Sequence, residues 1–160
     1  MRHIISLLVE NHQGVLSRIT GLFTGRGYNL ESLSTGPAAE SGLHRITLVC
    51  TGDDTVIEQI QKQLHKLVDV IRVDDLTHKR SMNRELALVK IRSTDIAKNG
   101  LFELIRLLGG SIVDVGTETV TLEVTGDSEK LNDVLASLQV YTICEVCRSG
   151  TVSMVRSCEY

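Results

Sequence analysis

Two copies of the order strand, helix, strand, strand, helix, strand predict an α+β fold class, two ferredoxin-like βαββαβ sandwiches in tandem. Short apolar runs of strand length alternate with apolar stripes at helical spacing. Right-handed crossovers then place both helices of a copy on one face of an antiparallel sheet. The tripeptide Thr51-Gly52-Asp53 recurs as Thr125-Gly126-Asp127, each time between the third strand and the second helix. We therefore expect an internal duplication.

The first copy is expected to occupy residues 1–76. It opens with an apolar strand, His3–Val9, and a short turn leads directly into a helix. Gly25-Arg26-Gly27 is a stop signal for that helix, and Thr51-Gly52-Asp53-Asp54 offers an N-cap for the second one. The other elements are strands and apolar helical stripes: the stripe Leu16, Ile19, Leu22 and Phe23, strands 28–35 and 43–51, the stripe Ile57, Ile60, Leu64 and Leu67, and strand 68–73.

The second copy is expected within residues 77–160, after a polar bridge over 74–84. Its elements follow the same order: strand 86–91, the stripe Leu101, Leu104, Ile105 and Leu108, strands 112–115 and 120–125, the stripe Leu131, Val134, Leu135 and Leu138, and strand 143–148. A copy of about 75 residues buries only a modest core. Its sheet keeps one face open, so we expect the chain to pair as a homodimer.

Composition narrows the classes of function. The chain has 160 residues, 42% of them hydrophobic and 23% charged, as in a soluble globular protein. A net charge of −3 and an aromatic content of 3% argue against a nucleic-acid surface. No apolar run is long enough to cross a membrane, and the N-terminus lacks the layout of a signal peptide. We expect a cytoplasmic protein that binds neither nucleic acid nor membrane.

The four cysteines do not predict a metal site. Cys144 and Cys147 have CxxC spacing but lie in a predicted strand, where residues three apart point to opposite faces. We expect reduced thiols, as in a cytosolic protein. The five histidines are scattered, and no nucleophile with a partner base or phosphate-binding glycine pattern is found. We therefore expect no metal, no cofactor and no catalytic residue in this chain.

The stretch Glu10–Ile19 carries the clearest binding signal. It joins a buried strand to a helix, so the free N–H groups of the helix N-terminus point at one spot and favour an anion. Gly14 allows close approach of a ligand to the backbone, and the amide of Asn11 both donates and accepts. A small zwitterion fits, with its carboxylate on the N–H groups and its ammonium on the Asn11 oxygen. The same residues also fit an ordinary strand-to-helix turn.

These segments carry a resemblance to a known family. The loop 11–16 and the segment 27–33 resemble the ACT domain, a small regulatory module that binds amino acids. More narrowly, the chain resembles the small regulatory subunit of acetolactate synthase (acetohydroxyacid synthase), also in the segments 63–70, 85–91, 112–115 and 148–150. The segment between Arg92 and Gly109 is only loosely similar, and the tail from Thr151 is nondescript.

The resemblance implies a regulatory function. A subunit of this kind binds the large catalytic subunit, raises its activity and confers feedback inhibition by valine in branched-chain amino acid biosynthesis. The large subunit carries thiamine diphosphate, magnesium and FAD. Residues 1–76 would be the amino-acid-binding ACT domain and 77–160 a C-terminal regulatory domain. The implied valine site takes residues from one chain and from its partner in the dimer: Asn11, Gly14, Val15 and Leu16, with Asn29 and Leu30 from the partner.

One alternative remains open at this point. An enzyme would need an acid–base pair or an activated nucleophile, and an RNA-binding module would need exposed aromatic residues on a basic sheet face; the sequence indicates neither. A free-standing ACT-type amino-acid sensor acting on another partner fits better, although segment 63–70 favours the synthase. In the second copy, Asp95–Gly100 stands where the loop would be and lacks the Asn-x-x-Gly pattern. We expect no second valine site there.

Overall fold

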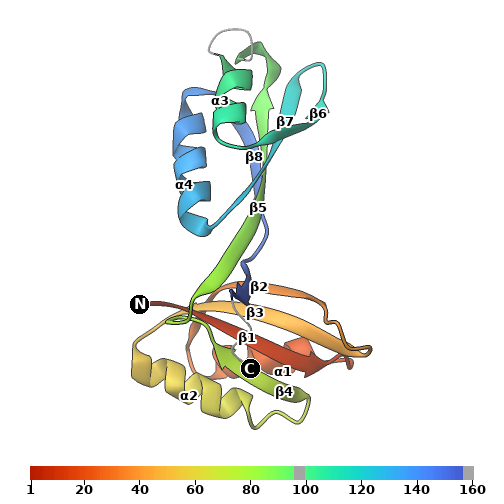
Figure 1. The fold of residues 1–160 in the computed structure, drawn as a ribbon, viewed down its shortest axis with the longest axis vertical. Coiled ribbons are helices and arrows are strands. Elements are labelled where there is room, and N and C mark those ends of the chain that lie inside the picture. Colours follow the sequence, from red (N-terminus) through yellow and green to blue (C-terminus); the bar gives the residue numbers. More distant parts are fainter. Residues whose placement is uncertain (96–99, 157–160) are drawn as a thin grey trace. The chain divides into compact units, whose positions relative to one another are not determined.

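The computed structural model describes residues 1–95 and 100–156 of the chain. They form two compact units (Figure 1), Met1–Met82 together with 151–156, and Asn83–Gly150. Each unit contains an antiparallel sheet with two helices, which confirms the predicted tandem α+β fold. The expected domain limits, 1–76 and 77–160, stay a prediction. No described helix has the length and hydropathy needed to span a bilayer.

The first unit has the predicted order of elements. Its sheet has the strand order β2-β3-β1-β4, in which every pair is antiparallel. The last strand begins at Val70, two residues later than expected, because backbone turns from Leu64 to Val70 occupy the preceding segment. The elements are β1 (Arg2–Glu10), α1 (Val15–Gly25), β2 (Asn29–Pro37), β3 (Leu43–Thr51), α2 (Asp54–Leu64) and β4 (Val70–Asp75).

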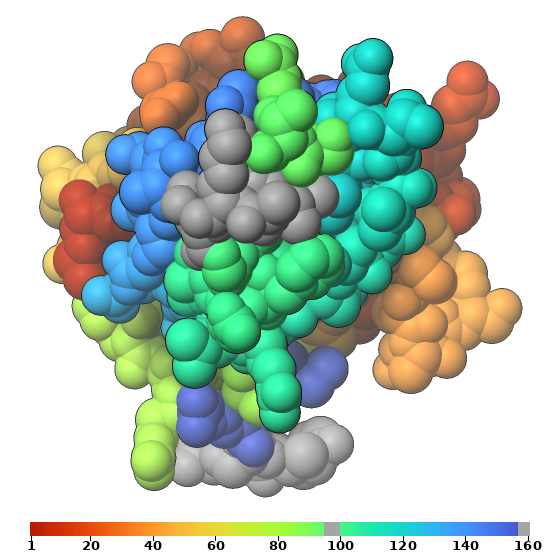
Figure 2. Space-filling view, turned by 90° about the horizontal axis from the view of Figure 1, so that it is seen from above, coloured from red at the N-terminus to blue at the C-terminus, as the bar shows by residue number. Residues whose placement is uncertain are grey.

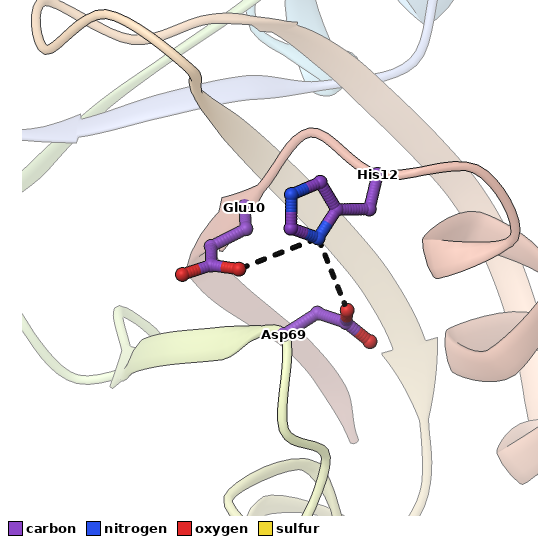
Figure 3. A group of neighbouring side chains, drawn as sticks. All are labelled: Glu10, His12 and Asp69. Atoms are coloured by element: carbon purple, nitrogen blue, oxygen red, sulfur yellow. Dashed lines mark ion pairs between the residues drawn. The ribbon is translucent and has the colours of Figure 1, made fainter.

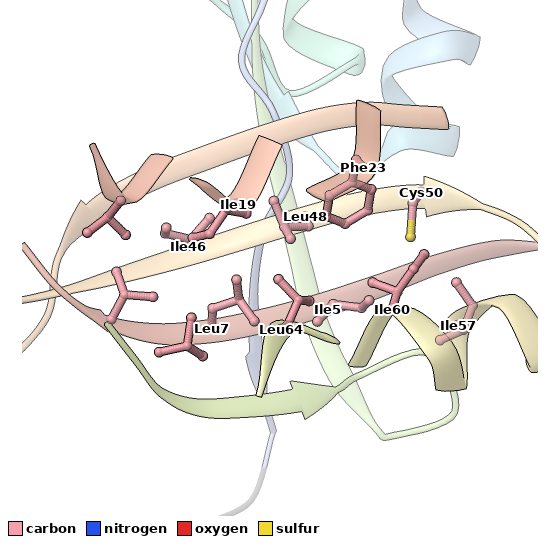
Figure 4. Packing of buried hydrophobic residues seen from close by; sticks show 13 residues of the cluster. Ile5, Leu7, Ile19, Phe23, Ile46, Leu48, Cys50, Ile57, Ile60 and Leu64 are labelled. Carbon is pink, nitrogen blue, oxygen red and sulfur yellow. The ribbon is translucent and has the colours of Figure 1, made fainter. Parts of the chain in front are cut away.

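The core of the first unit lies between its sheet and its two helices. Alternate residues of β1 and β3 point to this side, as the period of two requires. The helical stripes of α1 and α2 close over them, and Figure 4 shows these side chains meeting. Ring centroids of Phe23 and Tyr28 lie 6.4 Å apart in an edge-to-face contact. The labelled members of this core are Ile5, Leu7, Ile19, Phe23, Ile46, Leu48, Cys50, Ile57, Ile60 and Leu64.

The opposite face of this sheet is not fully open, which corrects the expectation. Ile4 and Val49 are buried there with Leu76, and Val155 of the terminal segment packs against them. That segment forms a short strand, β9 (Val152–Val155), which pairs with β5. The guanidinium of Arg2 also donates to the hydroxyl of Thr151 over 3.3 Å. The tail that looked nondescript therefore shields part of the first sheet from water.

The second unit repeats the arrangement with the strand order β6-β7-β5-β8. Part of the expected polar bridge is strand, because β5 already begins at Ser81. In Figure 2, α3 (green) lies at the surface between the blue segment of α4 and the cyan β6–β7 hairpin. The elements are β5 (Ser81–Arg92), the 3₁₀ turn Ser93–Asp95, α3 (Leu101–Leu107), β6 (Ser111–Val115), β7 (Thr119–Gly126), α4 (Ser128–Ser137), the 3₁₀ turn Leu138–Val140 and β8 (Ile143–Arg148).

The repeated Thr-Gly-Asp tripeptide has the same structural role in both units: its aspartate is a helix N-cap. Asp53 is the N-cap of α2, and its carboxylate accepts from the backbone N–H of Val56 over 2.8 Å. Asp127 is the N-cap of α4, and its carboxylate accepts from the N–H of Lys130 over 2.9 Å. Each aspartate thus satisfies an orphan donor of a helix start. The sequence repeat reflects a repeated folding signal.

Candidate functional site

A cavity of about 220 Å³ opens in the first unit where β1 passes into α1. Residues of the loop 11–14, which joins β1 to α1 within the stretch 10–19 that the sequence singled out, line it together with residues from two further strands. Residues from β1, the loop, α1, β2 and β3 line it: Val9, Glu10, Asn11, His12, Gly14, Val15, Leu16, Ser17, Thr35, His44 and Ile46.

The floor of the cavity is apolar. Val9 and Ile46 are each only 1% exposed, and Val15 in the first turn of α1 is 4% exposed. Val9 pairs with His44 across the β1–β3 ladder, and Thr35 pairs with Ile46 across the β2–β3 ladder. Paired residues lie on the same face of a sheet, so these four side chains share the helix side. The rim is polar, with imidazole, hydroxyl, amide and carboxylate groups.

The N-terminus of α1 opens toward this cavity without a cap of its own. Gly14 is the N-cap, with φ of 88°, and it offers no side-chain acceptor. The first intrahelical bond runs from the N–H of Arg18 to the carbonyl of Gly14 over 3.0 Å. The N–H groups of Leu16 and Ser17 therefore precede the helical ladder and have no intrahelical acceptor. Both residues line the cavity.

The charge at this helix start is also unusual within the chain. Of the four α-helices that the structure describes, only α1 has no acidic residue in its first turn. The others carry Asp54, Glu103 and Glu129 at the equivalent place. A carboxylate near a helix N-terminus is favourable by about 0.3–1 kcal/mol. At α1 the favourable negative charge has to come from a group outside the first turn of the helix.

Four of the six predicted effector residues line the cavity, namely Asn11, Gly14, Val15 and Leu16. The N–H of Asn11 donates to the carbonyl of Gly42 over 2.9 Å, which holds the loop. Leu16 is 42% exposed and is therefore not a core residue.

Asn29 and Leu30 do not line the cavity of their own chain. Asn29 lies at the opposite end of the sheet, where its side-chain amide is 3.5 Å from the hydroxyl of Thr51. Leu30 packs against the core of the first unit. Their assignment to the partner's cavity stays a prediction.

Sequence reasoning missed the strand residues of the cavity and part of its loop. Thr35 and His44 come from different strands, and only their pairing brings them beside Val9 and Ile46. The sequence placed Val9 and Ile46 in predicted strands, but it gave no sign that they border a cavity. Glu10, His12 and Ser17 were within the stretch singled out, yet no role was assigned to them.

A group of charged side chains lies beside the cavity loop (Figure 3). The imidazole Nδ1 of His12 is 3.4 Å from a carboxylate oxygen of Glu10 and 3.8 Å from one of Asp69. These three residues offer ligand atoms within 4.8 Å of one another. However, the guanidinium of Arg18 already lies 2.7 Å from the other oxygen of Asp69. Because that cation neutralises the carboxylate, we interpret the group as an ion-pair network and not as a metal site.

The second unit has a different helix start. Gly100 is the N-cap of α3 with φ of 63°, again without a side-chain cap. The carboxylate of Glu103 lies near it, with one oxygen 2.9 Å from the position of a Cβ on Gly100. The helix start thus carries its own negative charge. Residues 96–99 of the segment expected to replace the loop lie outside the described residues.

Comparisons with known proteins match both units. Residues 5–72 match the model of the AHAS small subunit-like ACT domain, and residues 84–157 match that of the small subunit of acetolactate synthase. A probable acetolactate synthase small subunit of Methanothermobacter thermautotrophicus is 44% identical over 155 residues, covering 96% of this chain and 92% of the relative. The chain belongs to the acetolactate synthase small-subunit family.

Two further members of the small-subunit family match nearly the whole chain. The acetolactate synthase isozyme 3 small subunit of Escherichia coli is 45% identical over 157 residues, which is 98% of this chain and 96% of the relative. The crystal structure of the acetolactate synthase small subunit from Thermotoga maritima has a TM-score of 0.89 at 36% identity, covering 98% of both chains. The resemblance inferred from the loop and the later segments is confirmed, and the matched ACT domain contains the whole cavity.

Proposed function

We propose that the chain is the non-catalytic regulatory subunit of acetolactate synthase. It activates the catalytic large subunit and confers feedback inhibition by valine in branched-chain amino acid biosynthesis. The large subunit is expected to carry thiamine diphosphate, magnesium and FAD, whereas this chain needs no cofactor. The observation that carries the proposal is an uncapped helix N-terminus, free of first-turn acid, that opens into a cavity with an apolar floor inside an ACT domain.

Valine matches this cavity group by group. Its carboxylate would accept from the N–H groups of Leu16 and Ser17 and supply the negative charge that α1 lacks. Its ammonium would lie at the rim, near the amide oxygen of Asn11 and the carboxylate of Glu10. Its isopropyl group would cover the apolar floor, and burying such a group contributes roughly 1.5–3 kcal/mol.

A homodimer would complete the site through the edge of the first sheet. β2 is the terminal strand of the order β2-β3-β1-β4 and starts at Asn29. If two copies of β2 pair antiparallel, the start of one strand lies beside the end of the other. The partner subunit's Asn29 and the partner subunit's Leu30 would then approach the end of β2, where Thr35 borders the cavity. This topology supports the assignment of those two residues to the site of the other chain.

The two units would have different roles. The carboxylate of Glu103 beside Gly100 disfavours a second amino-acid carboxylate at the start of α3. The second unit is therefore proposed to stabilise or report the liganded arrangement. Valine alters activity only if it binds one arrangement of the assembly better than another, and such coupling is typically about 1–3 kcal/mol.

Two measurements test the proposal. Calorimetric titration of the purified chain with valine, leucine and isoleucine should show saturable binding of valine, and it ranks the three amino acids by affinity. The chain alone should form no acetolactate from pyruvate with thiamine diphosphate, magnesium and FAD present, and its addition to the large subunit should raise that subunit's rate. The proposed function would be refuted by acetolactate formation by the chain alone. It would also be refuted if the rate of the large subunit changed neither on addition of the chain nor on addition of valine.

A further inference from the structure

We propose that Asp69, on the turn between α2 and β4, is the positioning residue of the cavity loop. This inference rests on the proposed effector site, which it deepens by naming what holds that site in shape. Asp69 does not line the cavity. It lies far from the loop in sequence, yet it contacts residues on both sides of Gly14.

The first contact fixes the helix side of the loop. The guanidinium of Arg18 places Nη2 2.7 Å and Nε 2.9 Å from Oδ2 of Asp69. The Asp69 side chain is 13% exposed and that of Arg18 is 49% exposed, so the carboxylate is held away from water while the guanidinium stays partly solvated. Nη1 of the same guanidinium lies 3.4 Å from the position of a Cβ on Gly14. Asp69 thus holds Arg18 over the left-handed turn at which α1 begins.

The second contact fixes the strand side of the loop. The carbonyl of Asp69 accepts from the N–H of Glu10 over 2.9 Å. Its other carboxylate oxygen, Oδ1, faces Nδ1 of His12 at 3.8 Å (Figure 3). One residue therefore joins the end of β1, the loop and the start of α1. Because both flanks are tied to the same point, the loop has few alternative conformations.

The turn that carries Asp69 is itself well anchored. Leu67 packs against the core of the first unit, and Val70 is 9% exposed. The N–H of Val70 donates to the carbonyl of Leu67 over 3.0 Å, and the N–H of Leu67 donates to that of Leu64 over 3.1 Å. A loop fixed to a well-anchored turn is preorganised, so ordering the loop on ligand binding costs little free energy. Asp69 links the cavity to this rigid support.

Strand β4, which begins directly after Asp69, offers a matched control. Asp74 has a side chain 16% exposed, and an oxygen of its carboxylate lies 2.8 Å from Nε of Arg72. Exposure and pairing are therefore close to those of Asp69. Asp74 does not line the cavity, and none of its described ion pairs involves the loop. Asp69→Asn and Asp74→Asn each remove one carboxylate from a partly buried ion pair, but only the first releases the loop.

The test combines hydrogen–deuterium exchange with valine titration of the full chain. In Asp69→Asn, amides of the peptide covering residues 10–16 should exchange roughly tenfold faster, as expected when the charge-assisted hydrogen bond that anchors Arg18 in the first turns of α1 is lost. The dissociation constant for valine should rise by about the same factor. Asp74→Asn should leave both quantities at the wild-type values. Unchanged exchange and unchanged affinity in Asp69→Asn would overturn the proposal.

Two further results are informative. If Asp69→Asn does not fold, Arg18→Gln removes the other half of the ion pair and should raise the exchange rate of the amides of residues 10–16 in the same way. A wild-type exchange rate in Arg18→Gln would overturn the proposal. If no variant and no wild-type chain binds valine, while Asp69→Asn alone loosens the loop, the effector assignment fails and the positioning role of Asp69 stands.

Discussion

Replacement of Gly14 is the sharpest test of the cavity as an effector site. Gly14 has φ of 88°, and a Cβ built there would lie 3.4 Å from Nη1 of Arg18, without a closer neighbour. A side chain therefore fits in space and costs mainly the left-handed backbone, about 1–2 kcal/mol. Gly14→Asp should fold with a modest loss of stability. Its new carboxylate would stand at the N-terminus of α1, where the carboxylate of valine is expected.

The effect on valine binding should be much larger than the effect on stability. Two like charges about 4 Å apart repel by about 4 kcal/mol at the effective dielectric constant of a protein surface, and screening at an open cavity lowers this to roughly 2–4 kcal/mol. The dissociation constant for valine should therefore rise at least about 30-fold. Gly14→Ala has the same destabilising left-handed backbone but adds no charge, so it should bind valine far better than Gly14→Asp.

Thermal unfolding and calorimetric titration measure the two effects separately. Gly109→Asp is the matched control, because Gly109 also has positive φ, 69°, and among the described residues its Cβ position meets only Nζ of Lys130 at 3.6 Å. It should lose a similar amount of stability and keep wild-type affinity for valine. Normal valine binding by Gly14→Asp, or an equal loss in Gly109→Asp, would show that the effector binds elsewhere.

Three other predictions follow from the structure. Burial, aided by the charges of Glu31 and Asp75, raises the pKa of the Cys50 thiol from 9.0 to about 11, so mass-spectrometric mapping after alkylation at pH 8 should find the exposed Cys144 and Cys147 labelled well before Cys50. Burial alone would raise the pKa of Asp75, but hydrogen bonds from Thr77 and Gln61 outweigh burial and hold that pKa below its usual value. The stability that results is present above about pH 4 and is lost as the pH falls. Asp75→Asn should therefore make the free energy of unfolding less dependent on pH in the acid range, and an unchanged pH profile would contradict this. Truncation after residue 79 should retain part of the activation of the large subunit but lose most valine inhibition in rate assays, and equal inhibition would show that residues 1–79 alone transmit the signal.

The order of elements could be predicted because it depends on local patterns. Apolar periodicity gave the strands and helices of both units, and the structure departs from it mainly by a few residues at element ends. The turn at Thr51-Gly52-Asp53-Asp54 predicted the cap of α2, since an N-cap needs only residues three positions apart, and its repeat at 125–127 marked the corresponding place before α4. Gly14 was singled out for its missing Cβ at the turn into the helix, which is also a local feature, and the structure adds that its backbone is left-handed.

The walls of the cavity could not be predicted from these patterns. Thr35 and His44 reach it only because the β1–β3 and β2–β3 registers align them with Ile46 and Val9. Register is set by the whole hydrophobic face and its bulges, such as the one between Leu30 and Ser32. A sequence pattern states which way a side chain points, but it does not state which distant residue lies beside it.

The chain's sequence by itself determined the duplicated βαββαβ order, the buried faces and the glycine turn that begins α1, because each depends on residues within one or two turns of backbone. Tertiary structure alone decided that Asp69 ties the loop to the α2–β4 turn and that Val155 covers Ile4 and Val49. Both contacts join segments more than 50 residues apart, and they form only once sheet register and helix packing have fixed where those segments meet.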